Sequence, residues 1–349
     1  MSQSTSLQKN ILVDIAIPVY NEEETIKQCL DSVLCFKKNE NVLVTIFIID
    51  GGSNDQTLEI INANFQHKKN IVVLHNPKRI QSSAMNIVID EGAGEYLLRL
   101  DAHSFYPHDY LETCLSTALD TDADNVGGLV ETIPGDKTYS ALLVQSLTTH
   151  WFGVGDSGFR IGAEAGPRDT VPYGFFNKSI FNKVGKYDER LVRAQDYELN
   201  SRIIKHGGLI WLNPKISLTY QNQSSLYNFY LKQLNLEAPY NAYMWWIQKE
   251  TFNFRHSITG FFSFGFLMGC ILSPFFELIL YPFMLVMTLY SFLALYASFQ
   301  QAIRYKNALH IFSLPMSFFL FHFLHGIGVL RGCVLLLLNK APVQNSEYQ

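Results

Sequence analysis

One long apolar stretch near the C-terminal end limits what this chain can fold into. Residues 257–299 form a run of 43 residues in which Glu277 carries the one formal charge. A helix needs about 20 apolar residues to cross a bilayer, so the run is long enough for two crossings. Pro274 and Glu277 lie near its middle, where a tight turn would hold the carboxylate among the lipid headgroups. We therefore expect membrane helices here, with an interfacial arrangement that does not span as the alternative.

The sequence on both sides of this stretch agrees with a membrane-embedded end. Arg304 and Lys306 follow the run, as positive residues do on the cytoplasmic side of a crossing. Residues 308–330 form a third apolar stretch, in which His322 and His325 share one helix face. These imidazoles could contact a lipid phosphate, but hydrogen bonds between helices are the favoured interpretation. The segment before the run is rich in aromatic residues, which suit a membrane interface: Tyr227, Phe229, Tyr230, Tyr240, Tyr243, Trp245 and Trp246.

Composition sets the first two thirds of the chain apart from this end. Residues 11–225 mix charged and apolar residues as a soluble α/β domain does. The net charge is −4 and the pI is near 6.2, and no basic stripe stands out, so we expect no nucleic-acid partner. The five cysteines follow neither a metal-ligand nor a disulfide spacing, which indicates a reducing compartment. Residues 1–10 lack the apolar core of a secretory signal, so we expect a disordered N-terminus and a cytoplasmic domain after it.

Short apolar runs alternate with helical patterns through the first hundred residues. Residues 11–19, 42–49, 71–74 and 95–100 are apolar or β-branched and indicate buried strands, while residues 81–91 have helical spacing. Strands and helices in this rhythm predict an α/β fold with a doubly wound, mostly parallel sheet. Ligands of such sheets bind beyond the carboxyl ends of the strands.

Four polar residues stand just past these predicted strand ends: Asn21, Asp50, Arg79 and Asp101. Each has an ordinary explanation when taken alone. Asp50 could be only the first residue of an Asp-Gly-Gly turn, and Arg79 only a surface charge. The acidic residues 22–24 suit the N-terminus of a helix. The convergence of four such groups on one crevice is the main argument for a site.

An Asp-x-His pattern ends the fourth predicted strand at Asp101 and His103. Side-chain direction repeats every two residues in a strand, so both residues face the same way and can hold one divalent cation. The cation would bridge phosphate oxygens, while Arg79 adds positive charge and Asp50 accepts hydrogen bonds from a base or ribose. Imidazole favours softer ions, so we expect Mn²⁺ rather than Mg²⁺. A satisfied polar pair at the mouth of a loop is the alternative.

Two later segments also carry candidate residues. Asp196 stands at a predicted helix start, either as a helix cap or as a general base that faces the metal. Gly174 lies in a strand-like segment at residues 169–176, where a glycine lets a ligand approach the backbone. Residues 153–158 match G-x-G-x-x-G, but they follow a predicted helix at 139–151 and precede none, so we interpret them as a flexible loop.

The chain resembles glycosyltransferase family 2 in five segments: IPVYNEEE (17–24), DGGSNDQT (50–57), NPKRIQSSAMN (76–86), GEYLLRLDAHS (94–104) and LVRAQDYELNSRI (191–203). The DAHS, DTVPYGFF and RAQDYELN sequences are similar to the succinoglycan-biosynthesis branch of membrane-associated transferases. The resemblance covers about residues 11–235. It implies a GT-A fold, a nucleotide-sugar donor, a divalent metal and inversion at the anomeric carbon.

The resemblance also implies residue roles. Asp50 contacts the nucleoside, Asp101 and His103 correspond to the metal-binding Asp-x-Asp of the family, and Asp196 is the catalytic base. His103 replaces the second aspartate, and Gln195 replaces the glutamate that precedes the base in many relatives. The Gln-x-x-Arg-Trp segment of processive members is not evident, so we expect one sugar per acceptor. The expected donor-binding residues are Pro18, Tyr20, Asn21, Glu22, Asp50, Arg79 and Asp101, and the expected acceptor-side residues are Tyr173, Gly174 and Gln195.

Together these features predict an inverting transferase of the cell membrane. We expect it to move one sugar from a UDP-sugar to a lipid-linked glycan or another membrane-bound acceptor in polysaccharide biosynthesis, because a soluble acceptor would need no anchor. Transfer to a polyprenyl phosphate and a non-catalytic carbohydrate-binding subunit are the alternatives. The expected domains are a catalytic domain at 11–225, an interface linker at 226–256, membrane helices at 257–338 and a polar tail at 339–349.

Overall fold

The computed structural model describes residues 10–342, without the side chains at 255 and 256. The expected disordered N-terminus and most of the expected polar tail lie outside the described residues. The chain divides into two compact units. The first contains residues 1–131 and 163–220, and the second contains residues 132–162 and 221–349.

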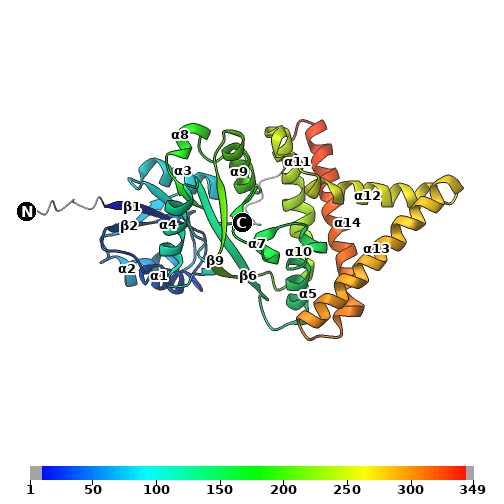
Figure 1. Ribbon diagram of the computed structural model, residues 1–349, viewed down its shortest axis with the longest axis horizontal. Helices are drawn as coiled ribbons and strands as arrows, with labels where there is room; N and C mark the ends of the chain where they lie inside the picture. Colours follow the sequence, from blue (N-terminus) through cyan, green and yellow to red (C-terminus); the bar gives the residue numbers. More distant parts are fainter. Residues whose placement is uncertain (1–9, 343–349) are drawn as a thin grey trace, which may run out of the picture. The chain divides into compact units, whose positions relative to one another are not determined.

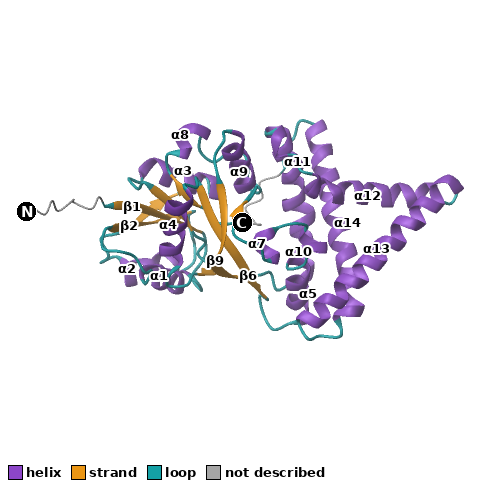
Figure 2. Cartoon of the chain, viewed as in Figure 1, coloured by secondary structure: helices purple, strands orange, loops and turns teal. Residues whose placement is uncertain are grey.

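The first unit is organised around a mixed sheet with the strand order β3-β2-β1-β4-β8-β6-β9-β5 and β7 beside β9 (Figures 1 and 2). β1 (Ile11–Val19) pairs in parallel with β2 (Val42–Asp50) and β4 (Tyr96–Arg99), and β2 pairs in parallel with β3 (Ile71–His75). These are the four strands that the sequence predicts. The later strands add antiparallel ladders, so the parallel order is limited to one half of the sheet. They are β5 (Ser104–Phe105), β6 (Asn125–Ile133), β7 (Gly166–Pro167), β8 (Phe175–Asn177) and β9 (Ile210–Gln221).

The centre of this sheet is apolar and closely packed. Val13, Ile15 and Ile17 of β1 are buried, as a strand with neighbours on both sides requires. Asp14 is buried among them, and its carboxylate accepts hydrogen bonds from the Gly94 amide at 2.8 Å and the Lys178 ammonium at 3.1 Å. The helices of this unit are α1 (Ile26–Leu34), α2 (Thr57–Phe65), α3 (Gln81–Glu91), α4 (Tyr110–Thr121), α8 (Ile180–Val184) and α9 (Gln195–Lys205).

The second unit consists mainly of helices (Figure 2). Its core joins α5 (Tyr139–Thr148) to the C-terminal helices, because Val144 and Leu147 of α5 pack with Phe229, Leu314 and Phe318. This packing assigns residues 132–162 to the helical unit, whereas the sequence-based boundaries keep them in the catalytic domain. The other elements are α6 (Trp151–Val154), α7 (Gly158–Ile161), α10 (Leu226–Lys232), the π-helix η1 (Gln233–Glu237), α11 (Ala238–Ile247), the 3₁₀ helix η2 (Lys249–Thr251), α12 (Phe254–Leu272), α13 (Glu277–Arg304) and α14 (His310–Leu337).

Among the described residues, two helices are long and apolar enough to cross a membrane, α13 and α14. α12 precedes them with a shorter apolar segment, and its turn into α13 contains Pro274, as the hairpin prediction requires. His322 Nδ1 lies 2.9 Å from the Tyr290 hydroxyl of α13, and His325 Nδ1 lies 2.8 Å from the Thr259 hydroxyl of α12. The two imidazoles therefore make the hydrogen bonds between helices that the sequence favoured.

The G-x-G-x-x-G segment is more ordered than the flexible loop that we expected. The one-turn helix α6 covers its start, and a second one-turn helix, α7, begins at Gly158. Gly153 is needed for packing, because a Cβ there would lie 2.0 Å from the Leu147 carbonyl oxygen. The segment thus joins α5 to the rest of the helical unit, a role that the glycine spacing alone does not indicate.

Replacement of Gly128 by alanine should destabilise the sheet. A Cβ at Gly128 of β6 would lie 1.8 Å from the backbone oxygen of Ile216 in β9, and two paired backbones cannot separate locally. Thermal unfolding of Gly128→Ala should show a lower Tm, equivalent to about 1–3 kcal/mol of overpacking. Gly265→Ala in α12 is the matched control, because no heavy atom lies within 4 Å of its added Cβ. Equal Tm values for both variants would contradict the β6–β9 packing.

Candidate active site

The strands that carry the predicted site residues end at one edge of the sheet. Val19 at the end of β1 is level with Asp50 at the end of β2, and Ala16 of β1 is level with Arg99 at the end of β4. These strands are parallel neighbours, so the loops that follow them begin side by side. The structure therefore brings the ends of β1, β2 and β4 together, as the sequence predicts.

Asp50 and Asn21 interlock the loops after β2 and β1. The buried Asp50 carboxylate accepts hydrogen bonds from the Gly52 amide at 2.9 Å, the Ser53 amide at 3.0 Å and the Ser53 hydroxyl at 2.7 Å. Asn21 has a φ of 56°, and its side-chain oxygen accepts a hydrogen bond from the Asn54 amide at 2.9 Å. Asp50 thus makes the turn contacts that the ordinary explanation requires, and its contact with a nucleoside stays a prediction.

Arg79 and Tyr20 meet beside these loops. The guanidinium carbon of Arg79 lies 5.9 Å from the centre of the Tyr20 ring, within range of a cation–π contact. A Cβ on Gly52 would lie 3.2 Å from Arg79 Nη2, and the φ of Gly52 is +82°, so glycine suits this position for two reasons. Pro18 lies within β1, before these loops, where it is level with Ile49 of β2. Residues from the loops after β1, β2 and β3 therefore meet here, and Arg79 brings a positive charge to them.

The Asp101 carboxylate is held by two neighbouring side chains. Its Oδ1 accepts hydrogen bonds from Arg99 Nη2 at 3.3 Å and from Gln81 Nε2 at 3.2 Å. The Asp101 amide donates to the Tyr106 hydroxyl at 2.7 Å, which fixes the backbone just past β4. Burial and the nearby Asp101 carboxylate both raise the pKa of Tyr106 well above its ordinary value, so Tyr106 stays a neutral phenol.

His103 contacts Glu22 in this structure. Its Nδ1 lies 3.0 Å from Glu22 Oε1, while Glu22 Oε2 accepts a hydrogen bond from the Thr25 hydroxyl at 2.8 Å. Over residues 10–342 no group of three or more His, Cys, Asp or Glu side chains is placed to hold a metal ion. Asp101 and His103 offer one carboxylate and one imidazole. Such a pair fits a cation that is completed by substrate phosphates and water rather than by a full protein cage.

Asp196 forms an ion pair with Arg99 instead of capping its helix. α9 begins after Ala194, whose left-handed φ of 62° turns the chain sharply into the helix. No side chain caps this end, and Asp196 lies in the first turn, where a negative charge is favourable. Its Oδ2 accepts a hydrogen bond from Nη1 of Arg99 in β4. The carboxylate is one third exposed, with a side-chain accessibility of 33%, so it is open to a second partner.

Five side chains form a closed network at this edge of the sheet. Arg99 joins the carboxylates of Asp101 and Asp196 through its two terminal nitrogens. Gln81 donates to Asp101, and its side-chain oxygen accepts a hydrogen bond from Gln195 Nε2 at 2.5 Å. Gln195 is next to Asp196 in sequence, which closes the ring. The Gln195 amide thus contacts Gln81, and the expected acceptor-side role of Gln195 stays a prediction.

Tyr173 and Gly174 both contact Arg99. The Arg99 guanidinium carbon lies 5.4 Å from the Tyr173 ring centre, and the Arg99 amide donates to the Gly174 carbonyl oxygen at 3.1 Å. Both residues have left-handed φ values, 61° and 57°. A Cβ on Gly174 would lie 2.3 Å from the Phe176 ring, so close packing explains this glycine without a ligand. The role of both residues toward an acceptor stays a prediction.

Arg99 and Gln81 are the site residues that sequence reasoning missed. Arg99 stands in the apolar run Leu97-Leu98-Arg99-Leu100, and a charge inside a buried strand was the signal available. Burial alone would lower the pKa of the Arg99 guanidinium, but the carboxylates of Asp196 and Asp101 raise it well above the ordinary value. Arg99 is therefore a permanent buried cation.

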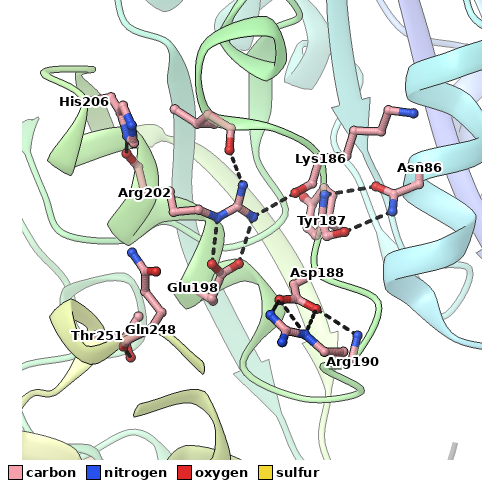
Figure 3. A network of polar contacts seen from close by, with 11 residues as sticks. Asn86, Lys186, Tyr187, Asp188, Arg190, Glu198, Arg202, His206, Gln248 and Thr251 are labelled. Atoms are coloured by element: carbon pink, nitrogen blue, oxygen red, sulfur yellow. Dashed lines mark hydrogen bonds and ion pairs between the residues drawn. The ribbon is translucent and has the colours of Figure 1, made fainter. Parts of the chain in front are cut away.

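A second arginine, the half-buried Arg202 of α9, anchors the segment that leads to Tyr187 (Figure 3). Arg202 of α9 donates to both carboxylate oxygens of Glu198 and to two backbone carbonyls of the segment that leads to Tyr187. Asn86 of α3 holds the same segment by bonds to the Tyr187 amide at 2.9 Å and carbonyl oxygen at 3.0 Å. Burial, and secondly the nearby Asp196 carboxylate, raise the pKa of Tyr187.

Known proteins resemble this chain in sequence and in fold. The model of Glycosyl transferase family 2 matches residues 14–185. The succinoglycan biosynthesis protein ExoA of Rhizobium meliloti (strain 1021) is 35% identical over 214 residues, which are 61% of this chain and 64% of ExoA. The match thus spans less than two thirds of that relative. A dolichyl N-acetyl-alpha-D-glucosaminyl phosphate 3-beta-D-2,3-diacetamido-2,3-dideoxy-beta-D-glucuronosyltransferase of Methanococcus voltae is 29% identical over 334 residues, 92% of this chain and 97% of that protein.

A solved structure has the same fold. The mannosyltransferase PcManGT from Pyrobaculum calidifontis, determined in complex with GDP-Man and Mn²⁺, matches with a TM-score of 0.57 and 13% identity over 96% of this chain and 89% of that chain. At this identity the likeness concerns the fold alone. The family match, the ExoA relative and this fold agree with one another. Residues 14–185 therefore match glycosyltransferase family 2 in sequence, and the chain has a GT-A fold.

Proposed function

We propose that this chain is an inverting, metal-dependent glycosyltransferase that moves one sugar from a nucleotide-sugar donor to a membrane-bound, lipid-linked acceptor. One observation carries the proposal. The carboxylates of Asp101 and Asp196, from distant segments of the chain, contact the same buried guanidinium at the carboxyl ends of parallel strands. A donor-side carboxylate and a base are thus close enough to act on one substrate, as a single displacement at the anomeric carbon requires.

The loops after β1, β2 and β3 would bind the donor. Arg79 supplies a cation beside Tyr20, and Asp50 holds the turn against which a nucleoside would lie. Asp101 and His103 would hold a divalent cation, with Mn²⁺ proposed over Mg²⁺ because of the imidazole. When bound, the cation would neutralise the charge that develops on the departing diphosphate. We propose a UDP-sugar as the donor.

Asp196 would act as the general base. An acceptor hydroxyl donates its proton to the Asp196 carboxylate while its oxygen attacks C1 of the sugar. The bond from C1 to the diphosphate oxygen breaks in the same step, and the nucleoside diphosphate leaves with that electron pair. Attack opposite the leaving group inverts C1.

The helical unit supports a lipid-linked acceptor. α13 and α14 are each 28 residues long and have mean hydropathies of 2.1 and 1.8 over their most apolar windows, which suits a bilayer anchor. The Methanococcus voltae relative, named for transfer to a dolichyl-phosphate-linked sugar, is similar over 92% of this chain, so the match extends beyond residues 14–185 into the C-terminal helical region. A sugar already carried by a lipid phosphate is thus a better proposal than the bare polyprenyl phosphate. We propose that the chain lies in the cell membrane with its catalytic domain in the cytoplasm.

Asp196→Asn should abolish transfer without loss of donor binding. The amide keeps the shape of the side chain but cannot accept the proton, so kcat should fall by about 10²- to 10⁴-fold. Transfer is measured with a radiolabelled nucleotide-sugar panel and a membrane lipid extract, and UDP binding with Mn²⁺ is measured by calorimetry. Wild-type turnover in this variant would remove Asp196 from the mechanism.

Asp101→Ala should weaken donor binding, the property that Asp196→Asn should leave intact. Loss of this carboxylate should weaken Mn²⁺-dependent UDP binding by about 10- to 100-fold, the equivalent of one charged contact of about 1.5–3 kcal/mol. Calorimetry with and without Mn²⁺ measures the effect, and Asp90→Ala, which removes an exposed carboxylate that pairs with Lys186, is the control. If Asp101→Ala retains metal-dependent binding, the cation is held elsewhere.

The acceptor class can be tested by product extraction. With the full chain in nanodiscs, the labelled sugar should enter the organic phase, and mild acid, which cleaves sugars from polyprenyl phosphates, should release it as part of a larger glycan. Release of the single labelled sugar would instead identify polyprenyl phosphate as the direct acceptor. Label that stays entirely in soluble glycans would contradict a lipid-linked acceptor.

A further inference from the structure

We propose that Arg99 is a positioning residue that sets the separation between the donor-side carboxylate of Asp101 and the base Asp196. The inference rests on the proposed function and adds to it a residue that touches neither substrate. Arg99 would act by holding the two carboxylates, so that the acceptor hydroxyl meets C1 in line with the departing diphosphate.

The shape of the contact supports this role. Nη1 of Arg99 contacts Asp196, and Nη2 lies 3.3 Å from Asp101 Oδ1. Each carboxylate therefore binds a different terminal nitrogen of the same planar guanidinium. The guanidinium itself has little freedom. It lies over the Tyr173 ring at 5.4 Å, its backbone amide is bonded to the Gly174 carbonyl oxygen, and its side chain is 7% exposed. A lysine ammonium is a single point charge and cannot reproduce such a fork.

A second connection runs parallel to the first. Gln81 donates to Asp101 and accepts from Gln195, the residue before the base. Two independent links thus join the end of β4 to the start of α9. Since α9 has no side-chain cap at this end, these links and the turn at Ala194 fix where Asp196 lies. Neutralisation of the Arg99 charge alone would not require the contacts of Gln81 with Asp101 and Gln195.

Charge makes the arrangement sensitive to loss of Arg99. The Arg99 guanidinium pairs with Asp196, the buried phenol of Tyr187 lies near the same carboxylate, and Asp101 binds the other terminal nitrogen of Arg99. Without the guanidinium, two carboxylates would repel each other across a poorly solvated space. Asp196 would then turn toward solvent, which its partial exposure permits. A displacement of about 1 Å at a reacting group lowers the rate by about 10²-fold.

A purely structural ion pair is the competing explanation, and the chain offers a matched control for it. Arg202 is also largely buried, with a side-chain exposure of 15%, lies in α9 and pairs with Glu198 in the same helix (Figure 3). Its partners are Glu198 and the carbonyl oxygens of Val184 and Lys186, to which we assign no part in the reaction. If Arg99 only stabilises the fold, then Arg99→Met and Arg202→Met should behave alike, with a lower Tm and a normal kcat per folded molecule.

The test compares Arg99→Lys, Arg99→Met and Arg202→Met in the full chain in nanodiscs. We expect both Arg99 variants to lose about 10²-fold in kcat per folded molecule, while Mn²⁺-dependent UDP binding measured by calorimetry stays within about threefold of wild type. Arg202→Met should keep its kcat. In an Asp196→Asn background, Arg99→Met should lower the residual rate by less than about threefold, because a residue that acts through the base has nothing left to position.

Three results would overturn the proposal. The first is a wild-type kcat in Arg99→Met, and the second is an equal loss of kcat and UDP affinity, which would make Arg99 a donor ligand. The third is a full additional loss in the Asp196→Asn background. Absence of both transfer and UDP binding in the wild-type chain would refute the proposed function itself. Transfer by the wild type with a normal Arg99→Met would refute only the role of Arg99.

Discussion

The edge of the sheet that forms the candidate active site depends on one buried cation. Arg99 is placed by an otherwise apolar strand, and burial of a guanidinium is strongly unfavourable unless carboxylates neutralise it. Asp101, two residues later, provides one carboxylate, and α9 has to approach β4 to provide the other, Asp196. The left-handed turn at Ala194 permits that approach. The pairing requirement of Arg99 thus explains why segments so far apart in sequence meet at one point.

The surrounding loops are rigid for equally local reasons. The Asp50 carboxylate accepts hydrogen bonds from the backbone of the turn after β2. The Asn21 side chain, in the turn after β1, accepts a hydrogen bond from the Asn54 amide in the loop after β2. A donor would therefore meet a surface that is largely formed in advance, with little ordering cost on binding. In the helical unit, two imidazoles of α14 likewise have hydrogen-bond partners within the protein. His322 and His325 reach hydroxyls on neighbouring helices, as polar groups in an apolar environment must.

The sequence predicts the parts that are governed by local patterns. Apolar runs ended by polar residues predict β1 to β4 and their meeting edge, and the charge-poor stretch predicts the apolar helices with their turn at Pro274. It does not predict long-range partners. The pairing of His103 with Glu22, the direction of the Gln195 amide and the bridge at Arg99 depend on which helix packs against which strand. The packing of α5 with the C-terminal helices is equally non-local, since its partners Phe229, Leu314 and Phe318 lie far away in sequence.

The most direct test of this account is the anomalous scattering of Mn²⁺ in crystals of the full chain with a non-hydrolysable nucleotide sugar. The account predicts one metal peak within coordination distance of Asp101 and His103, bridged to the diphosphate, with C1 of the sugar facing the Asp196 carboxylate. A metal bound away from Asp101 would contradict it. So would a donor whose diphosphate lies between C1 and Asp196, because the base could then not reach an attacking hydroxyl.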